Sequence, residues 1–114
     1  MTEAGKVAED LAARYLASRG LKLITRNYRC RFGEIDLILQ DGKTTVFAEV
    51  RLRESQRFGG AAASVGTQKQ QRLIATAQHY LAGQHTPPIC RFDVITLDRL
   101  EPSAIEWIKD AFGE

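Results

Sequence analysis

Two short runs in which polar and apolar residues alternate, residues 34–39 and 45–51, are separated by a tight turn. Such alternation is typical of strands that bury one face. Between the runs lies Gly42-Lys43, and Gly at the first central position favours a type II′ hairpin turn. The sequence therefore predicts a β-hairpin. Because side chains alternate along a strand, the turn decides which of them face each other.

The polar face of this hairpin carries two acids. If the apolar residues of both strands are buried together, Asp36 and Glu49 share the opposite face. A Gly42-Lys43 turn places these two acids directly across from each other, whereas an Asp41-Gly42 turn leaves them diagonal on the same face. The residues assigned to the buried face are Ile35, Leu37, Leu39, Val46, Ala48, Val50 and Leu52.

Opposed carboxylates destabilise a strand pair unless a shared proton, a basic neighbour or a divalent cation offsets their charge. Carboxylate oxygens suit a hard ion such as Mg²⁺ or Mn²⁺. With Arg51 two residues after Glu49, the acids would hold a metal that activates water, and the cation would stabilise charge on phosphorus. The alternative is an ordinary solvated face on which Arg51 pairs with Glu34 or Glu49. These residues alone leave both interpretations open.

Charge is unevenly distributed although the net charge is only +2. Every charged residue between Leu11 and Gly33 is basic, a further basic cluster spans residues 51–57, and the tail from Asp98 onward is mostly acidic. Such segregation favours a basic face for a phosphate backbone. The alternative is a scatter of arginines that serves solubility.

At 114 residues the chain can build one hydrophobic core but not two. We find no apolar run long enough to cross a bilayer and no leader-like segment after Met1. Cys30 and Cys90 are isolated and lack zinc-site spacing, so reduced thiols are expected. These features predict a cytoplasmic protein.

The remaining pattern predicts an α/β fold with a mixed central β-sheet flanked by helices. Residues 3–19 form an amphipathic helix with Thr2 as N-cap and Gly20 just past its end. Residues 21–28 form a strand with Leu21, Leu23 and Ile24 facing inward. A second helix, capped by Thr67, runs to about residue 81, and a strand follows at 91–97. That helix would be a right-handed crossover between parallel strands. The tail at 105–109 is either a last strand, which we favour, or a helix begun at Pro102.

Several motifs resemble, in order and spacing, the bacterial YraN-like family. The resemblance covers essentially the whole chain, and the hairpin block is its most specific part. The family is similar to the Holliday-junction resolvases and to the restriction-endonuclease-like nucleases with a PD-(D/E)xK motif. The motifs are Gly5-x-x-x-Glu9-x-x-Ala12, Arg26-Asn27-Tyr28, Gly33-Glu34-Ile35-Asp36-Leu37-Ile38, Val46-Phe47-Ala48-Glu49-Val50-Arg51-x-Arg53, Phe58-Gly59, Lys69 and Arg91-Phe92-Asp93-Val94.

The resemblance implies that residues 1–114 form a single restriction-endonuclease-like domain of α-β-β-β-α-β order with a possible last strand. It implies a Mg²⁺- or Mn²⁺-dependent endonuclease that hydrolyses DNA phosphodiesters, with branched DNA as a candidate substrate. A homodimer is expected if junctions are cut. The alternative is a non-catalytic nucleic-acid-binding protein that keeps the nuclease fold.

The resemblance also assigns roles to residues. Asp36 and Glu49 match the two metal-binding acids, Val50 would offer its backbone carbonyl, Glu9 matches the first-helix acid, and Arg51 occupies the lysine position. Arginine does not lose its proton and so cannot act as a base. Lys69 could supply the amine instead, or contact phosphate, or be an ordinary solvated lysine. Glu34 would support the acids or pair with Arg51. Contacts to nucleic acid are expected from Arg29, Arg31, Arg53, Arg57 and Lys69.

Overall fold

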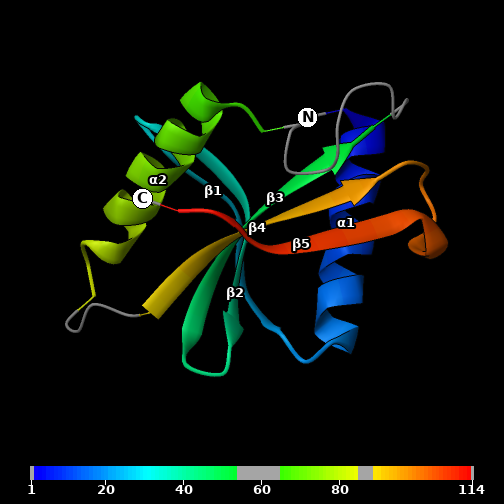
Figure 1. Cartoon of the computed structure of the whole chain (residues 1–114), viewed down its shortest axis with the longest axis horizontal. Coiled ribbons are helices and arrows are strands. Elements are labelled where there is room, and N and C mark those ends of the chain that lie inside the picture. The colour runs from blue at the N-terminus through cyan, green and yellow to red at the C-terminus, as the bar shows by residue number, and fades with distance from the viewer. Residues whose placement is uncertain (1, 54–64, 85–88, 114) are drawn as a thin grey trace.

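A computed structural model describes residues 2–53, 65–84 and 89–113 as one mixed five-stranded sheet with a helix on each face (Figure 1). The order α-β-β-β-α-β-β confirms the predicted fold class. Neither α-helix of the described residues is long and apolar enough to span a membrane. The elements are α1 (Glu3–Ser18), β1 (Lys22–Cys30), β2 (Gly33–Asp41), β3 (Thr44–Leu52), α2 (Thr67–Leu81), β4 (Ile89–Leu97), a 3₁₀ turn (Pro102–Ala104) and β5 (Ile105–Phe112).

The strands follow one another across the sheet in chain order. The pairs β1–β2, β2–β3 and β4–β5 are antiparallel. The pair β3–β4 is parallel, which confirms the crossover predicted through the second helix. The favoured prediction of a last strand is confirmed, since Ile105–Phe112 form β5. Pro102 begins only a short 3₁₀ turn before that strand. The parallel pair places β3, the strand that carries Glu49, at the centre of the sheet.

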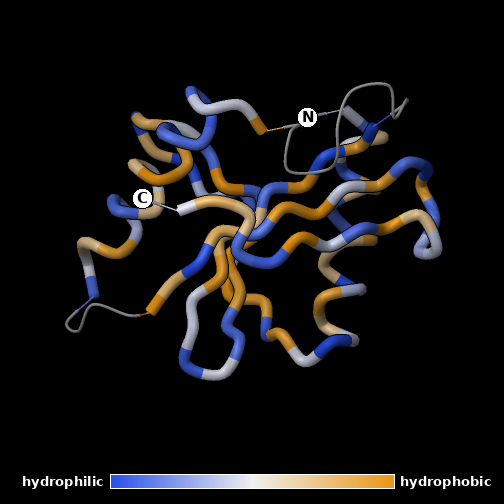
Figure 2. Tube along the Cα trace, in the orientation of Figure 1, coloured by the Kyte–Doolittle hydropathy of each residue, from blue (hydrophilic) through white to orange (hydrophobic). Residues whose placement is uncertain are grey.

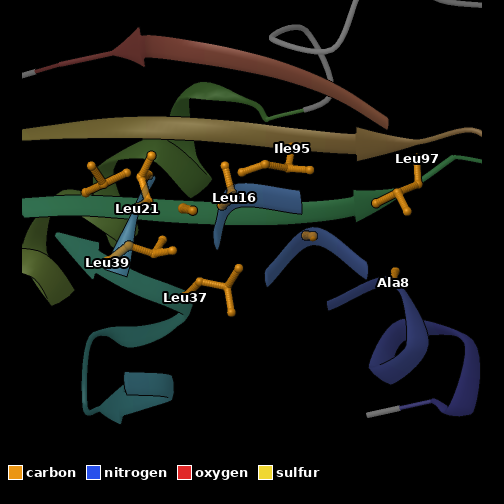
Figure 3. Packing of buried hydrophobic residues seen from close by; sticks show 10 residues of the cluster. Ala8, Leu16, Leu21, Leu37, Leu39, Ile95 and Leu97 are labelled. Atoms are coloured by element: carbon orange, nitrogen blue, oxygen red, sulfur yellow. The ribbon is translucent and has the colours of Figure 1, made fainter. Parts of the chain in front are cut away.

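Helix α1 covers one face of the sheet through small residues. The Thr2 hydroxyl accepts a hydrogen bond from the Gly5 amide at 2.9 Å, which confirms the predicted N-cap. Ala8, Ala12 and Leu16 are fully buried and pack on the sheet (Figure 3). The strands are mostly hydrophobic where they cross at the centre of the molecule (Figure 2). This first core cluster also holds Leu21, Leu37, Leu39, Val46, Ala48, Ile95 and Leu97.

Helix α2 covers the opposite face and builds a second core cluster. Leu73 and Ala77 pack there against residues from all five strands. Within this cluster the Phe47 ring is stacked on the Phe92 ring, with 5.5 Å between their centroids. The helix ends at Leu81 as predicted, but Thr67 is its first residue and Gly66, rather than Thr67, is its N-cap. The cap makes no side-chain hydrogen bond, because Gly66 has no side chain to donate or accept one.

The inward placement predicted for Leu23 and Ile24 is wrong. Both side chains are exposed, at 39% and 45%, while Leu21 is buried. The physical reason is position: β1 is an edge strand, and its pairing with β2 shifts register between Leu23 and Thr25. Such an irregularity turns side chains away from regular alternation.

The hairpin turn is Gly42-Lys43, since Asp41 pairs with Thr44 and Leu37 with Ala48. Gly42 has φ 60°, the positive angle that the first central residue of a type II′ turn requires. One further pair in this register sets Asp36 opposite Glu49. There the regular pairing gives way, because the Val50 amide donates to Asp36 Oδ2 at 2.8 Å.

This change displaces one residue from its predicted face. Ile35 belongs to the cluster under α2, not to the cluster with Leu37 and Leu39. Alternation carries across a strand only while its backbone pairing is regular. Ile35 lies just beyond the last regular pair of β2 with β3, Leu37 with Ala48, next to the hydrogen bond between the Val50 amide and Asp36.

A second buried acid is held by a network of its own. Asp93 is 1% exposed and accepts hydrogen bonds from the Arg91 guanidinium, the Trp107 indole and the Asp110 amide. Trp107 in turn packs edge-on against Tyr15 at 6.2 Å between ring centroids. Donors therefore satisfy the Asp93 carboxylate on several sides, and this cluster ties β4 to β5.

Candidate functional site

A pocket opens between the start of β2, the centre of β3 and the first turns of α2. Asp36 and Glu49 project into it from the sheet, and Lys69 and Arg72 from the helix. Acids and bases from three elements therefore meet at one concave place, which is the kind of site that binding and catalysis favour. Its lining is completed by Gly33, Glu34 and Leu73.

Asp36 and Glu49, which we call the acid pair, are hydrogen-bonded to each other through their side chains. Glu49 is only 4% exposed, and Asp36 is bonded to it as well as to the Val50 amide. Burial, followed by the hydrogen bond and the charge of Glu49, raises the pKa of Asp36 to about 8, against the lowering effect of the Val50 amide. At neutral pH the pair therefore holds a proton that a cation could replace.

Two cations contact the same oxygen of Glu49. Lys69 Nζ lies 2.5 Å from Glu49 Oε2, and Arg51 Nη1 lies 3.8 Å from it. The nearer cation is thus the lysine of α2, while the arginine of β3 is a weaker neighbour. This confirms the pairing of Arg51 with Glu49 that we left open. The pairing of Arg51 with Glu34 is wrong, because Glu34 pairs with Arg29 at 2.6 Å.

Glu9 of α1 is near enough to Asp36 to feel its charge, but its hydrogen bonds and ion pair are with Asn27 and Arg26. Its side chain is buried, takes Asn27 Nδ2 at 3.2 Å on both oxygens, and lies 3.6 Å from Arg26. The pKa of Glu9 is raised, because burial and the charge of Asp36 outweigh the lowering effects of Asn27 and Arg26. Among residues 2–53, 65–84 and 89–113, no three acidic, His or Cys side chains form a metal-binding group. The role of Glu9 as a ligand stays a prediction.

The predicted nucleic-acid contacts are spread around the pocket. Arg29 is exposed beside Glu34, and Arg31 covers the Phe32 ring at 4.9 Å from its centroid. Arg53 is mostly buried and pairs with Asp98 at 3.3 Å, so it lies less open than expected. Arg57 and Phe58 fall outside the described residues. Of the members of the predicted set that the structure describes, only Lys69 lines the pocket itself.

Three residues that line the pocket were not predicted as site residues: Gly33, Arg72 and Leu73, which the sequence predicts as core. Arg72 follows Lys69 by three positions, and helical spacing alone would have placed both on one face of α2. Gly33 lines the pocket because the chain turns there against the helix. A Cβ at Gly33 would lie 3.3 Å from Thr76 Oγ1, and its φ is 149°. Sequence gives no signal for that close approach.

Gly33→Ala is expected to destabilise the fold by about 1–2 kcal/mol, because alanine avoids this φ and its methyl group would press on Thr76. Urea unfolding measures the change. Gly83→Ala is the matched control, since a Cβ at Gly83 meets nothing within 4 Å and its φ is not positive. Equal stabilities of the two variants would contradict the expectation.

The donor set of the acid pair fits a divalent cation. Asp36 and Glu49 offer hard oxygen ligands side by side, of the kind that Mg²⁺ and Mn²⁺ prefer. Burial and the neighbouring Glu49 carboxylate raise the pKa of Asp36, so a bound cation would relieve an unfavourable charge there. The Val50 carbonyl belongs to the same strand, and its use as a ligand stays a prediction.

The element order and the acid pair on the adjacent strands β2 and β3 define an α/β protein with a mixed five-stranded sheet and a charged pocket beside its centre. Comparison with known proteins then identifies the family. The model of the uncharacterised protein family UPF0102, the YraN-like family, matches residues 8–97, and the chain belongs to this family.

Close relatives span nearly its whole length. A UPF0102 protein of Methylobacillus flagellatus is 54% identical over 113 residues, covering 99% of each chain. One from Nitrosomonas europaea is 54% identical over 96% of this chain and 93% of its own. One from Ralstonia nicotianae is 57% identical over 96% of this chain and 85% of its own. The resemblance inferred from the motifs is confirmed.

Proposed function

We propose that this protein is a metal-dependent nuclease that hydrolyses phosphodiester bonds of DNA. The observation that carries the proposal is the acid pair, buried at the centre of the sheet and open to one pocket beside Lys69 and Arg72. A buried acidic pair next to cations suits phosphoryl chemistry, in which a divalent ion activates water and fixed positive charges stabilise the charge that develops on the phosphoryl group.

In this proposal Asp36 and Glu49 hold Mg²⁺ or Mn²⁺. When bound, the ion supplies a nucleophilic water at neutral pH and neutralises developing charge on the phosphoryl group. Lys69, Arg51 and Arg72 bind the phosphate oxygens, since Lys69 and Arg51 already lie beside Glu49 and Arg72 lines the same pocket. None of the three needs to lose a proton in this role.

DNA is the proposed polymer because the charge of residues 11–33 is wholly basic. Arg29, near the end of β1, and Arg31, in the turn between β1 and β2, lie next to the pocket residues Gly33 and Glu34. Branched DNA is the proposed form, in line with the resemblance to junction resolvases. A homodimer would then present two sites related by symmetry.

One observation favours a second candidate, a nucleic-acid-binding protein that does not cut. Lys69 Nζ lies 2.5 Å from Glu49 and so neutralises one of the acids that would hold the ion. Arg51 replaces the motif lysine and cannot serve as a base. In this alternative the pocket binds phosphate only.

A cleavage assay separates the two candidates. Labelled four-way junction, flap, single-stranded and duplex DNA, with an RNA of equal length, are incubated with the protein in Mg²⁺, Mn²⁺ or EDTA. We expect cutting that requires the metal and is lost in Asp36→Asn and Glu49→Gln. Glu101→Gln is the matched control, because Glu101 is exposed and pairs with Arg99.

Cutting that persists in both acid variants would contradict the acid pair as the site. If the wild type leaves every substrate intact but retards them in a gel, the binding protein is the better description. Binding of that kind would fall steeply with salt, since it rests on phosphate contacts. The ranking of substrates decides between branched and plain DNA, and the RNA arm between DNA and RNA.

A further inference from the structure

An exposed aromatic and basic surface lies beside the pocket, formed by Arg31, Phe32 and His79, which we call the stacking surface. The Phe32 and His79 rings lie 6.2 Å apart between centroids, edge to face. The Arg31 guanidinium covers the Phe32 ring at 4.9 Å. The Tyr28 hydroxyl is hydrogen-bonded to His79 Nδ1 at 2.6 Å and so fixes the position of the imidazole.

These side chains are not part of either core. Phe32 is 39% exposed and does not belong to the cluster under α2, although Tyr28 and Tyr80 pack on that cluster. Arg31 and His79 are exposed as well. A single exposed ring needs no explanation, but an exposed ring grouped with a guanidinium and an imidazole offers the side chains that stack on nucleic-acid bases.

The stacking surface is continuous with the pocket. Lys69, Arg72 and His79 follow one another at helical spacing along α2 and so share one face. Gly33, the residue after Phe32, lies between Arg72 and Thr76 and lines the pocket. The β1–β2 turn lies beside α2 (Figure 1). Ten residues at a rise of 1.5 Å place His79 about 15 Å along the helix from Lys69.

We propose that the stacking surface binds unpaired bases of a single-stranded DNA segment whose backbone continues into the pocket. The inference rests on the proposed function for the role of the pocket, and it specifies the substrate: DNA with a single-stranded portion next to the cut. About 15 Å corresponds to roughly four stacked nucleotides at 3.4 Å each.

The chemistry of the surface selects this occupant. Every base has a π face, and aromatic rings and guanidinium groups accept it without regard to sequence. The bases of a duplex are already stacked on each other and cannot reach a side chain in this way. The cations Lys69, Arg72 and Arg31 match the charge of the backbone that links the bases. A ring between cations is therefore complementary to a single strand rather than to a duplex.

Binding without cleavage tests the proposal. Fluorescence anisotropy in EDTA measures the affinity of the protein for labelled single-stranded, flap and blunt duplex DNA. Phe32→Ala is expected to weaken binding of the single-stranded and flap DNA by about ten-fold or more, with duplex binding nearly unchanged. Phe32→Trp should restore it. Leu100→Ala is the matched control, since Leu100 is 42% exposed in the turn after β4.

The outcomes separate this proposal from the nuclease proposal. Equal loss on single-stranded and duplex DNA, no loss in Phe32→Ala, or no binding of single strands by the wild type would each overturn the stacking surface. Metal-dependent cutting of plain duplex would then leave the nuclease proposal standing. Selective loss of single-strand binding supports the stacking surface, even for a protein that cuts nothing.

Discussion

Replacing Asp36 by asparagine is expected to stabilise the metal-free fold at pH 8. Burial and the Glu49 carboxylate raise the pKa of Asp36 to about 8 in the folded state, from an ordinary value near 4. Between these values the folded chain holds a proton that the unfolded chain has released. Since the unfolded state then binds fewer protons, stability falls as the pH rises through this window.

The expected size of the decline is large for a single residue. Between pH 5 and pH 8 the wild type should lose on the order of 3 kcal/mol of unfolding free energy through this group. Asparagine resembles the protonated acid: its oxygen can still accept from the Val50 amide, and its NH₂ can donate to Glu49. Asp36→Asn should therefore show a much smaller decline and exceed the wild type at pH 8.

Magnesium is expected to reverse this order. An ion that binds the folded acid pair stabilises it by mass action, and its binding strengthens with pH as the shared proton leaves. Urea unfolding at pH 5 and pH 8, with Mg²⁺ or EDTA, measures all four conditions. The wild type should gain stability with Mg²⁺ at pH 8, while Asp36→Asn should not. Glu101→Gln serves as the control and should behave as the wild type.

Two results would contradict this account. A wild type that becomes more stable from pH 5 to pH 8 would mean that Asp36 is charged in the fold at neutral pH. An Asp36→Asn protein that still responds to Mg²⁺ would mean that the ion binds elsewhere. The expected result, in contrast, would show that Asp36 lowers the stability of the metal-free fold. Such a cost is common at residues that serve a functional site.

The hairpin was predictable because its information is local. Alternation places Asp36 and Glu49 on one face with either turn, and the observed Gly42-Lys43 turn is the one of the two that sets them opposite each other. Ile35 could not be placed in this way. It lies beyond the last regular pair of β2 with β3, where alternation no longer assigns a face.

Other errors arise where the answer depends on the rest of the molecule. Leu23 and Ile24 look like core residues, but nothing in the sequence marks β1 as an edge strand. His79 has no partner within its own helix that the sequence could indicate. Its neighbours Tyr28, in β1, and Phe32, in the β1–β2 turn, come about fifty residues earlier. Contacts between distant segments of this kind require the topology.

The cation of the site is expected to be Lys69 rather than Arg51. Lys69 Nζ is 2.5 Å from Glu49 Oε2, and Arg51 Nη1 is 3.8 Å from the same atom. Under the proposed function, Lys69→Met should lower kcat by about 10²- to 10³-fold, as loss of one fixed charge at a reacting group does. Arg51→Met should cost less. Single-turnover cleavage at saturating metal measures both.

Controls separate chemistry from folding in this comparison. Lys43→Met removes a lysine from the exposed hairpin turn and should leave kcat unchanged. Urea unfolding of each variant shows whether the fold survives, and DNA binding in EDTA shows whether affinity does. A larger loss of kcat in Arg51→Met would mean that Arg51, at the lysine position of the motif on β3, is the catalytically important cation. A larger loss in Lys69→Met would mean that the amine of the nuclease motif is here supplied by α2, from a different element but to the same carboxylate.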